Sequence, residues 1–372
     1  MAGTGAFSRR AFGRLLGTGA AAAALPPLFA AGDAVAGVAR TAQRGIVRLS
    51  ANENPYGPSP AALRAMRDAF ALAWRYPDEA TDEMIGDLAK LHGLSKESFL
   101  IGDGSSEILK LAASAFTDAT RDLVLADPTF EAIAAHARVR DADVVAVPLD
   151  GGFAHDLENM AVDGAGLIYV CNPNNPTGTI TPNAKLRSFL DAIPAATMVL
   201  VDEAYHHYAD SADYQSVLPL VATHPNLVVA RTFSKVHGLA GLRLGYAIAQ
   251  PEVVKKLAEQ AAWDSANIIA LAAGRASLAD DAYVAEGRRR NAATKAQVVA
   301  GLGRLGYQVV PSQTNFILID TRKDVKPTIE ALRDRGVLVG RLFPALPRHL
   351  RVTIGTPAQM RRFLEAFAAV LA

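Results

Sequence analysis

The chain has 372 residues, of which half are hydrophobic and a fifth charged, as expected for a globular protein with a substantial core. The formal net charge is +1, and the sequence has no basic stripe, zinc spacing or charged tail, which argues against nucleic-acid binding. A single cysteine, Cys171, excludes an intrachain disulfide. No histidine pair has convincing metal-ligand spacing, so no metal site is predicted.

Residues 1–36 have the layout of an export signal. Arg9 and Arg10 precede a weakly apolar, alanine-rich stretch, and the small residues 34–36 suit a signal peptidase. Paired arginines at this place are similar to a twin-arginine signal. Glycines and two prolines at 26–27 interrupt the apolar run, which argues against stable membrane insertion. We therefore predict export, for example to the periplasm; the alternative is a disordered tail or a wrongly assigned start, with the protein in the cytoplasm.

From residue 37 the sequence predicts an N-terminal arm, followed by a loop rich in proline and glycine. Helical spacing predicts helices over residues 60–73 and 81–92. Residues 102–106, Gly-Asp-Gly-Ser-Ser, open a further helix that runs to about Phe116. A glycine-rich turn at a helix N-terminus offers backbone N–H groups and a positive dipole end to a phosphate, although such turns also simply cap helices.

The middle of the chain alternates between strands and helices. Short β-like runs occupy residues 122–126, 144–149, 166–171, 197–202, 227–231 and 245–249. This alternation predicts an α/β fold, a mostly parallel sheet sandwiched by helices. A long helical region follows, from about residue 251 to 305.

The C-terminal part has a different pattern, with strands expected at 307–310, 315–320, 337–340 and 350–354 and helices at 325–335 and 357–371. This pattern predicts a smaller α+β domain. The predicted organisation is a signal (1–36), an arm with part of the small domain (37–75), a large domain (76–275) and a small C-terminal domain (276–372).

Two of the predicted strands end in polar groups that suit a pyridine ring. Asn175 follows the first of them, and Asp202 and Tyr205 end the second. Ligands bind at the carboxyl ends of strands in open α/β sheets. A carboxylate keeps a ring nitrogen protonated, and an amide and a phenol can bond a ring hydroxyl. The alternatives are a helix N-cap for Asp202 and a plain turn at Asn175.

Lys235 lies in the most informative segment, residues 231–245, bracketed by small hydroxylic residues and glycines. A lysine that forms a Schiff base needs room for a bulky cofactor and a nearby cation for its phosphate. Gly238 and Gly241 leave room, and Ser234 and Arg243 can bind a phosphate. The segment therefore favours a lysine that carries pyridoxal 5′-phosphate (PLP) over a solvated surface loop.

From about residue 46 to its end, the chain resembles the fold-type I PLP-dependent aminotransferases of class I/II, and most closely their histidinol-phosphate aminotransferase branch. The motifs that carry this resemblance are Asn52-Glu-Asn-Pro-Tyr-Gly-Pro58, Tyr76-Pro-Asp78, Gly102-Asp-Gly-Ser-Ser-Glu107, Asp127-Pro-Thr-Phe130, Asn172-Pro-Asn-Asn-Pro-Thr-Gly178, Asp202-Glu-Ala-Tyr205, Ser234-Lys235, Gly241-Leu-Arg243 and Leu350-Arg-Val-Thr-Ile-Gly355.

The resemblance implies further site residues. Phe130 is expected to stack on the cofactor ring, or else to pack in the core. Tyr76 is expected to reach the cofactor phosphate of a second subunit, which implies a homodimer; a surface turn is the alternative. Arg351 is expected to bind a substrate carboxylate as a fork, and Asn315 and Tyr56 to line the substrate pocket. The remaining expected contacts with the phosphate are Gly104, Ser105, Ser106 and Thr232.

The predicted reaction is transfer of an amino group between an amino acid, or an amine such as histidinol phosphate, and a 2-oxo acid such as 2-oxoglutarate. Lys235 would serve as base and acid, and Asp202 as the partner of the ring nitrogen. A decarboxylase or lyase on the same site is the first alternative, and a non-catalytic exported binding protein is the second. An export signal argues against histidinol phosphate, which belongs to a cytoplasmic pathway.

Overall fold

The computed structural model describes residues 45–371, and residues 47–371 lie in one compact unit. The predicted signal and most of the arm lie outside the described residues. In the part of the chain that the structure describes, no helix is both long and apolar enough to cross a membrane.

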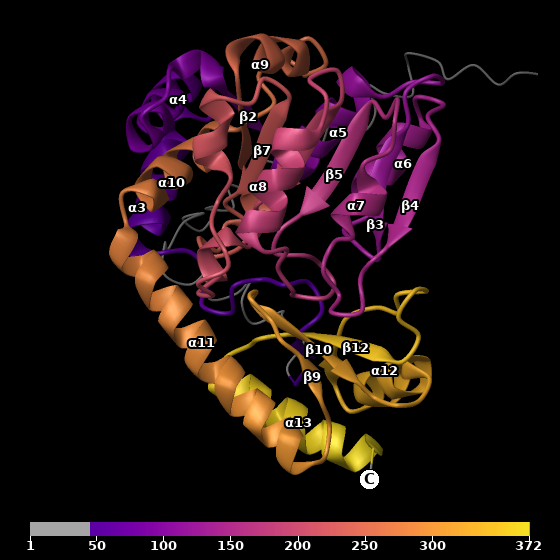
Figure 1. Ribbon diagram of the computed structural model, residues 1–372. Helices are drawn as coiled ribbons and strands as arrows, with labels where there is room; N and C mark the ends of the chain where they lie inside the picture. The colour runs from indigo at the N-terminus through magenta and orange to yellow at the C-terminus, as the bar shows by residue number, and fades with distance from the viewer. Residues whose placement is uncertain (1–44, 372) are drawn as a thin grey trace, which may run out of the picture. The chain divides into compact units, whose positions relative to one another are not determined.

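The described residues form a central sheet of seven strands in the order β2-β8-β7-β6-β5-β3-β4 (Figure 1). Strands β4, β3, β5, β6 and β7 run parallel, whereas β8 is antiparallel to both β7 and β2. The predicted mostly parallel sheet is thereby confirmed. The sequence prediction missed β2, a short strand that closes one edge. The bounds are β2 (Phe99–Gly102), β3 (Leu123–Asp127), β4 (Val144–Pro148), β5 (Leu167–Cys171), β6 (Met198–Asp202), β7 (Leu227–Thr232) and β8 (Gly245–Ala249).

Helices cover both faces of this sheet because successive strand residues point to opposite sides. On β6, Met198 and Leu200 pack with one group of helices, and Val199 and Val201 pack with the other. The first group is α5 (Ser105–Phe116), α6 (Ala132–Arg138) and α9 (Pro251–Ala258). The second is α3 (Pro60–Ala69), α4 (Asp78–His92), α7 (Leu157–Met160), α8 (Asn183–Ala192) and α10 (Ile268–Leu278).

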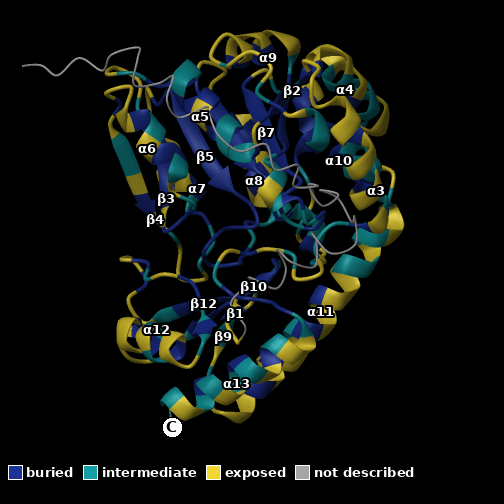
Figure 2. Ribbon diagram, turned by 180° about the vertical axis from the view of Figure 1, so that it is seen from behind, coloured by how far each residue is buried: buried dark blue, intermediate teal, exposed yellow. Residues whose placement is uncertain are grey.

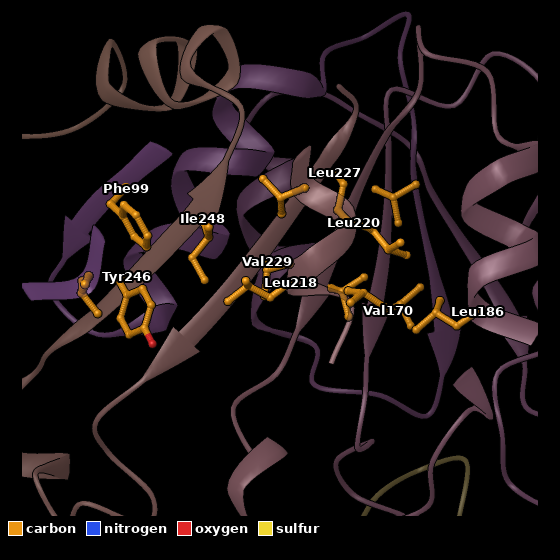
Figure 3. Packing of buried hydrophobic residues seen from close by; sticks show 14 of the residues in the cluster. Phe99, Val170, Leu186, Leu218, Leu220, Leu227, Val229, Tyr246 and Ile248 are labelled. Atoms are coloured by element: carbon orange, nitrogen blue, oxygen red, sulfur yellow. The ribbon is translucent and has the colours of Figure 1, made fainter. Parts of the chain in front are cut away.

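The core is continuous under the second group of helices. Figure 3 shows side chains from β2, β5, β7 and β8 meeting Leu186 of α8 and the turn that carries Leu218 and Leu220. Full burial of each such side chain stabilises the fold by roughly 1.5–3 kcal/mol. The central strands, such as β5 and β7, are dark blue in Figure 2, whereas the edge strand β4 is mostly not, so the ends of the central strands are held by a buried core.

The C-terminal part has its own small core. β10 (Phe316–Asp320) pairs antiparallel with β12 (His349–Thr353) and with β9 (Val309–Val310), while β1 (Val47–Arg48) pairs in parallel with β11 (Val337–Leu338). Helices α12 (Val325–Asp334) and α13 (Pro357–Leu371) pack against these strands.

The helical region expected from residue 251 to 305 is three helices, α9, α10 and α11 (Asp281–Arg304), rather than a continuous run. Side chains of Asn267 and Asp280 accept hydrogen bonds from backbone N–H groups at the starts of α10 and α11. Each new helix therefore begins at an N-cap, which satisfies N–H groups that a helix start leaves free.

Candidate active site

A cavity of about 300 Å³ opens where β5, β6 and β7 end, and it lies in the size range of small-molecule sites. Its lining comes from separate segments of the chain, from residue 51 to residue 351. The predicted site residues that line it are Ser105, Ser106, Phe130, Asn175, Asp202, Tyr205, Thr232, Ser234, Lys235, Arg243 and Arg351. The structure therefore brings together most of the residues that the sequence singled out.

Asp202 is the last residue of β6 and is almost fully buried. Its carboxylate accepts hydrogen bonds of 3.0 Å from the Tyr169 hydroxyl and from the N–H of Ala204. Burial raises the pKa of Asp202 to about 6, although these hydrogen bonds act in the opposite direction. Within residues 45–371 no cationic side chain forms an ion pair with it, so the site holds a buried carboxylate that a cationic ligand would stabilise.

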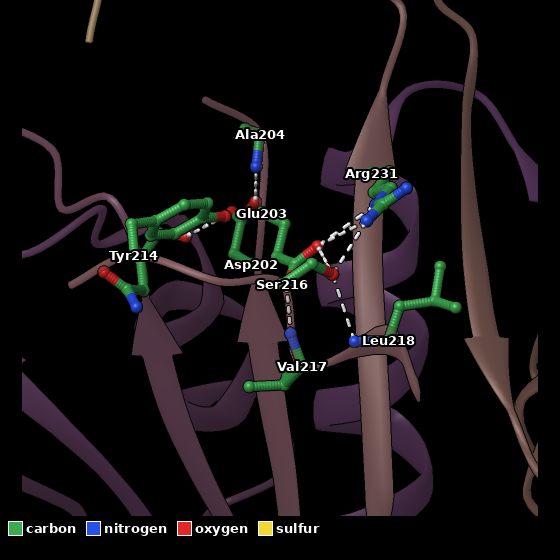
Figure 4. A network of polar contacts seen from close by, with 9 residues as sticks. Asp202, Glu203, Ala204, Tyr214, Ser216, Val217, Leu218 and Arg231 are labelled. Atoms are coloured by element: carbon green, nitrogen blue, oxygen red, sulfur yellow. Dashed lines mark hydrogen bonds and ion pairs between the residues drawn. The ribbon is translucent and has the colours of Figure 1, made fainter. Parts of the chain in front are cut away.

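A buried ion pair next to Asp202 fixes the ends of β6 and β7 relative to each other (Figure 4). Arg231 Nη2 lies 2.8 Å from Glu203 Oε2, and the Ser216 hydroxyl and the Val217 N–H also donate to this carboxylate. Removing one member of such a pair leaves an unpaired buried charge and typically costs about 3–5 kcal/mol. The network holds Asp202 and the segment after β7 in place.

Lys235 follows β7 on a tight loop. The N–H of Ser234 donates to Thr232 Oγ1, and the N–H of Gly238 donates to the carbonyl of Lys235. A Cβ at Gly238, where φ is 71°, would collide with the backbone of Gly57. Only glycine at position 238 therefore allows this loop conformation. The loop presents the Lys235 amine to the cavity, where Nζ lies 5.3 Å from the centre of the Tyr205 ring.

The start of α5 and Arg243 form the end of the cavity that suits an anion. Gly104 precedes the helix with φ of 78°, and a Cβ there would collide with the Arg243 guanidinium. Ser105 and Ser106, in the first turn, line the cavity together with Ser234. Free N–H groups at a helix start, serine hydroxyls and an arginine make a built phosphate site.

Arg351, on β12, brings the C-terminal part into the cavity. Its guanidinium donates to Asn175 Oδ1 and to the carbonyl of Ser50, each over 2.7 Å. The side chain is 9% exposed, and its Nε has no hydrogen-bond partner in the described part of the chain. Burial lowers the pKa of Arg351 from its ordinary value. A buried guanidinium with an unused donor suits an anionic group of a ligand.

Four predicted site residues are absent from the lining of this cavity. Tyr76 is 80% exposed and does not line the cavity of its own chain. Tyr56 lies at a separate small cavity, under the Arg290 guanidinium. Asn315 lines that same small cavity and donates to the carbonyl of Asn52. Gly104 itself is not in the lining, although its two successors are.

Sequence reasoning missed two residues of the site. Asn52 is buried with φ of 55°, lines the cavity and donates to the Tyr205 hydroxyl over 3.0 Å. Its position as the first residue of the motif 52–58 was the feature of the sequence that could have identified it. Tyr169, which donates to Asp202, carried a weaker signal: a tyrosine hydroxyl in an otherwise apolar buried strand needs a partner.

Three histidines pack behind the Lys235 loop. The His206 and His207 ring centres lie 3.7 Å apart, and His207 stands 5.1 Å from His237. Burial lowers the pKa of all three imidazoles, that of His237 to about 4. They are therefore neutral at physiological pH and act as packing groups.

These features fit PLP. The buried Asp202 carboxylate suits a protonated ring nitrogen, the start of α5 with Arg243 suits a phosphate, and Lys235 supplies an amine between them. Burial raises the pKa of the Cys171 thiol, so this lining residue is no competing nucleophile.

Comparison with known proteins decides the family. The model of the aminotransferase class I and II family matches residues 44–367. The chain belongs to this family. A histidinol-phosphate aminotransferase of Symbiobacterium thermophilum is 43% identical over 330 residues, 88% of this chain and 91% of the relative.

Solved structures of this aminotransferase family agree. Histidinol-phosphate aminotransferase from Sinorhizobium meliloti, in complex with pyridoxal-5′-phosphate, is 28% identical with a TM-score of 0.83 over 94% of this chain and 95% of that chain. L-threonine-O-3-phosphate decarboxylase from Porphyromonas gingivalis has a TM-score of 0.78 over 87% of this chain and 99% of that chain, but at 22% identity it shows the fold alone. The protein is thus a PLP-dependent aminotransferase of fold type I.

Proposed function

We propose that this aminotransferase takes its amino group from histidinol phosphate and passes it to a 2-oxo acid such as 2-oxoglutarate. The named relatives support the donor, and the observation that carries the proposal is Arg351: a buried guanidinium that lines the cavity and uses two of its five N–H donors in hydrogen bonds within the protein. A fork of this kind binds a phosphate as well as a carboxylate. One arginine can then hold the phosphate of the donor and, in the second half of the cycle, the carboxylate of the acceptor.

PLP, when bound, supplies an aldehyde that condenses with amines and a ring that withdraws electrons. Lys235 would hold the cofactor through its Nζ. Once displaced by the substrate amine, Lys235 would take the proton from the substrate Cα as a general base. It would then donate a proton as a general acid later in the same half-reaction. Asp202 would keep the ring nitrogen protonated, and Phe130 would stack on the ring.

Hydrogen bonds orient the remaining groups for this role. Asn52 donates to the Tyr205 hydroxyl and fixes its position, and Lys235 Nζ lies over the face of the same ring. Arg351 donates to the Asn175 carbonyl oxygen, which leaves the Asn175 amide N–H groups free for the cofactor oxygen. The cofactor ring and the substrate anion would thus be held by one connected set of polar groups.

An amino acid in place of histidinol phosphate is the second candidate donor, and the same Arg351 fork favours it. The decisive experiment is product analysis with 2-oxoglutarate and a panel of donors that includes histidinol phosphate and common amino acids. Formation of glutamate and the oxo form of histidinol phosphate supports the proposal. Turnover of amino acids alone, or release of carbon dioxide, would overturn it.

We also propose a homodimer in which Tyr76 of each subunit reaches the phosphate end of its partner's site. In its own chain Tyr76 is 80% exposed, and two neighbouring aromatic residues, Trp74 and Phe70, are 73% and 62% exposed. Exposed apolar side chains that lie together are typical of a protein–protein interface. Sedimentation should give twice the chain mass. Tyr76→Phe should weaken PLP binding without changing that mass.

Export remains a separate proposal, since its signal lies outside the described residues. Arg9 and Arg10 before an alanine-rich stretch support it. Replacing both with lysine should retain folded, yellow protein in the cytoplasm of a host with a working twin-arginine system. Unprocessed wild-type protein found only in the cytoplasm would contradict export, and would also strengthen histidinol phosphate as the donor.

A further inference from the structure

Tyr169 is the one polar residue type in the apolar run of β5 that carries a hydroxyl, and its side chain is fully buried. It lies level with Leu125 of β3 on one side and with Leu200 of β6 on the other, and it packs in the same apolar cluster as both. Its hydroxyl donates to Asp202 Oδ2 over 3.0 Å. A buried hydroxyl without a partner costs free energy, so the carboxylate of Asp202 is what makes a tyrosine acceptable at this position.

The direction of this hydrogen bond is fixed. Burial, together with the charge of Asp202, raises the pKa of the Tyr169 hydroxyl well above its ordinary value. The hydroxyl therefore keeps its proton over the whole range of pH in which an enzyme works, and toward an ionised carboxylate it can only donate. A donated hydrogen bond stabilises the charged form of the carboxyl group and lowers its pKa.

The balance of forces on Asp202 leaves its ionisation sensitive to this one bond. Burial raises the pKa of Asp202 to about 6, not far below physiological pH. Of the groups that favour the charged form, Tyr169 has the largest effect, followed by the N–H of Ala204 at 3.0 Å and then by the charge of Lys235. The titratable groups close enough to influence Asp202 electrostatically are Tyr169 and Cys171 of β5, the adjacent Glu203, Tyr214, and Lys235 of the loop after β7.

We propose that Tyr169 is a positioning residue that keeps Asp202 ionised, so that the proton between Asp202 and the cofactor ring stays on the ring nitrogen. The proposal rests on the proposed function, because it takes Asp202 as the partner of that nitrogen. Without the hydroxyl the carboxylate becomes a stronger base, and the shared proton moves toward its oxygen. Loss of the proton weakens electron withdrawal by the ring, so Lys235 takes the substrate proton more slowly. Tyr169 does not line the cavity and would act only through Asp202.

The test locates the proton by ¹⁵N NMR of the enzyme loaded with PLP labelled at its ring nitrogen, because protonated and neutral pyridines resonate in separate ranges. At pH 7.5 the wild type should give a signal in the protonated range, and Asp202→Asn one in the neutral range. Tyr169→Phe should move the signal from the protonated toward the neutral range. Tyr307→Phe removes a hydroxyl that donates to the carbonyl of Leu371 in the C-terminal part, and it should leave the signal unchanged. Thermal melting confirms that each variant is folded.

Kinetics give a second reading. Tyr169→Phe should lower kcat about tenfold, as expected for loss of a hydrogen bond to a charged group, and leave KM for donor and acceptor unchanged. In the Asp202→Asn background the same change should have no further effect on kcat, since Tyr169 acts through that carboxylate. A wild-type ¹⁵N signal in Tyr169→Phe, or an equal loss of kcat in the Asp202→Asn background, would overturn the proposal. A wild-type signal in Asp202→Asn would instead overturn the role that the proposed function gives to Asp202.

Discussion

The sheet part and the C-terminal part contribute differently to the cavity. The sheet part supplies groups at strand and helix ends, such as Asp202, Lys235 and Arg243, each fixed by a tight turn or a buried ion pair. The C-terminal part supplies Arg351, a buried guanidinium on β12. Under the proposed function, cofactor chemistry belongs to the sheet part and substrate binding to the C-terminal part.

The largest effect should come from Lys235→Ala, which removes the group that moves the proton. General acid–base catalysis is worth about 10²–10⁴-fold, so we expect kcat to fall by about three orders of magnitude for every donor. Lys185→Ala, an exposed lysine on α8, is the matched control and should leave kcat unchanged. Retained turnover in Lys235→Ala would place the chemistry elsewhere.

Asp202→Asn should be the next most damaging change, because it keeps shape and removes charge. Loss of an electrostatic contact of this kind costs on the order of 3 kcal/mol in the barrier, or about a hundredfold in kcat. The variant should still fold, as judged by its melting temperature. Near-normal kcat would mean that Asp202 does not hold the ring nitrogen.

The buried histidines behind the Lys235 loop should make the stability of the fold depend on pH. An unfolded histidine binds a proton near pH 6.5, whereas burial lowers the pKa of His237 to about 4. The unfolded state binds more protons between these values, so acid destabilises the fold, by roughly 2 kcal/mol for this group from pH 7.5 to 5.

Urea unfolding at pH 7.5, 6.5 and 5 measures this loss. His237→Phe keeps a ring beside Phe233 and should remove its share of the pH dependence. An equal slope in the variant would show that His237 is not kept neutral by burial.

Arg351→Lys changes the residue that the C-terminal part contributes to the cavity, and it should have the smallest effect on kcat. Lysine keeps the charge but loses the fork, so KM for the acceptor should rise about tenfold, or about 1.4 kcal/mol, with kcat little changed. Initial rates across a range of 2-oxoglutarate concentrations separate the two constants. A lower kcat with unchanged KM would move Arg351 from substrate binding to the chemical step.

Most of the sheet part could be predicted from sequence because its signals are local. An apolar run followed within a few residues by Asp202 or Asn175 predicts both a strand and its polar end. The missed strand β2 has only four residues, too few for a clear period. Asn52 and Tyr169 matter through hydrogen bonds to residues 153 and 33 positions away, which no local pattern encodes.

Lys235 is the residue on which every other role in the site depends, because it would carry PLP. Borohydride reduction of the PLP-saturated enzyme, followed by peptide mapping, tests it directly. We expect one labelled peptide containing Lys235, with the yellow absorption lost on reduction and no label in Lys235→Ala. A label on any other lysine, or none in saturated protein, would contradict it.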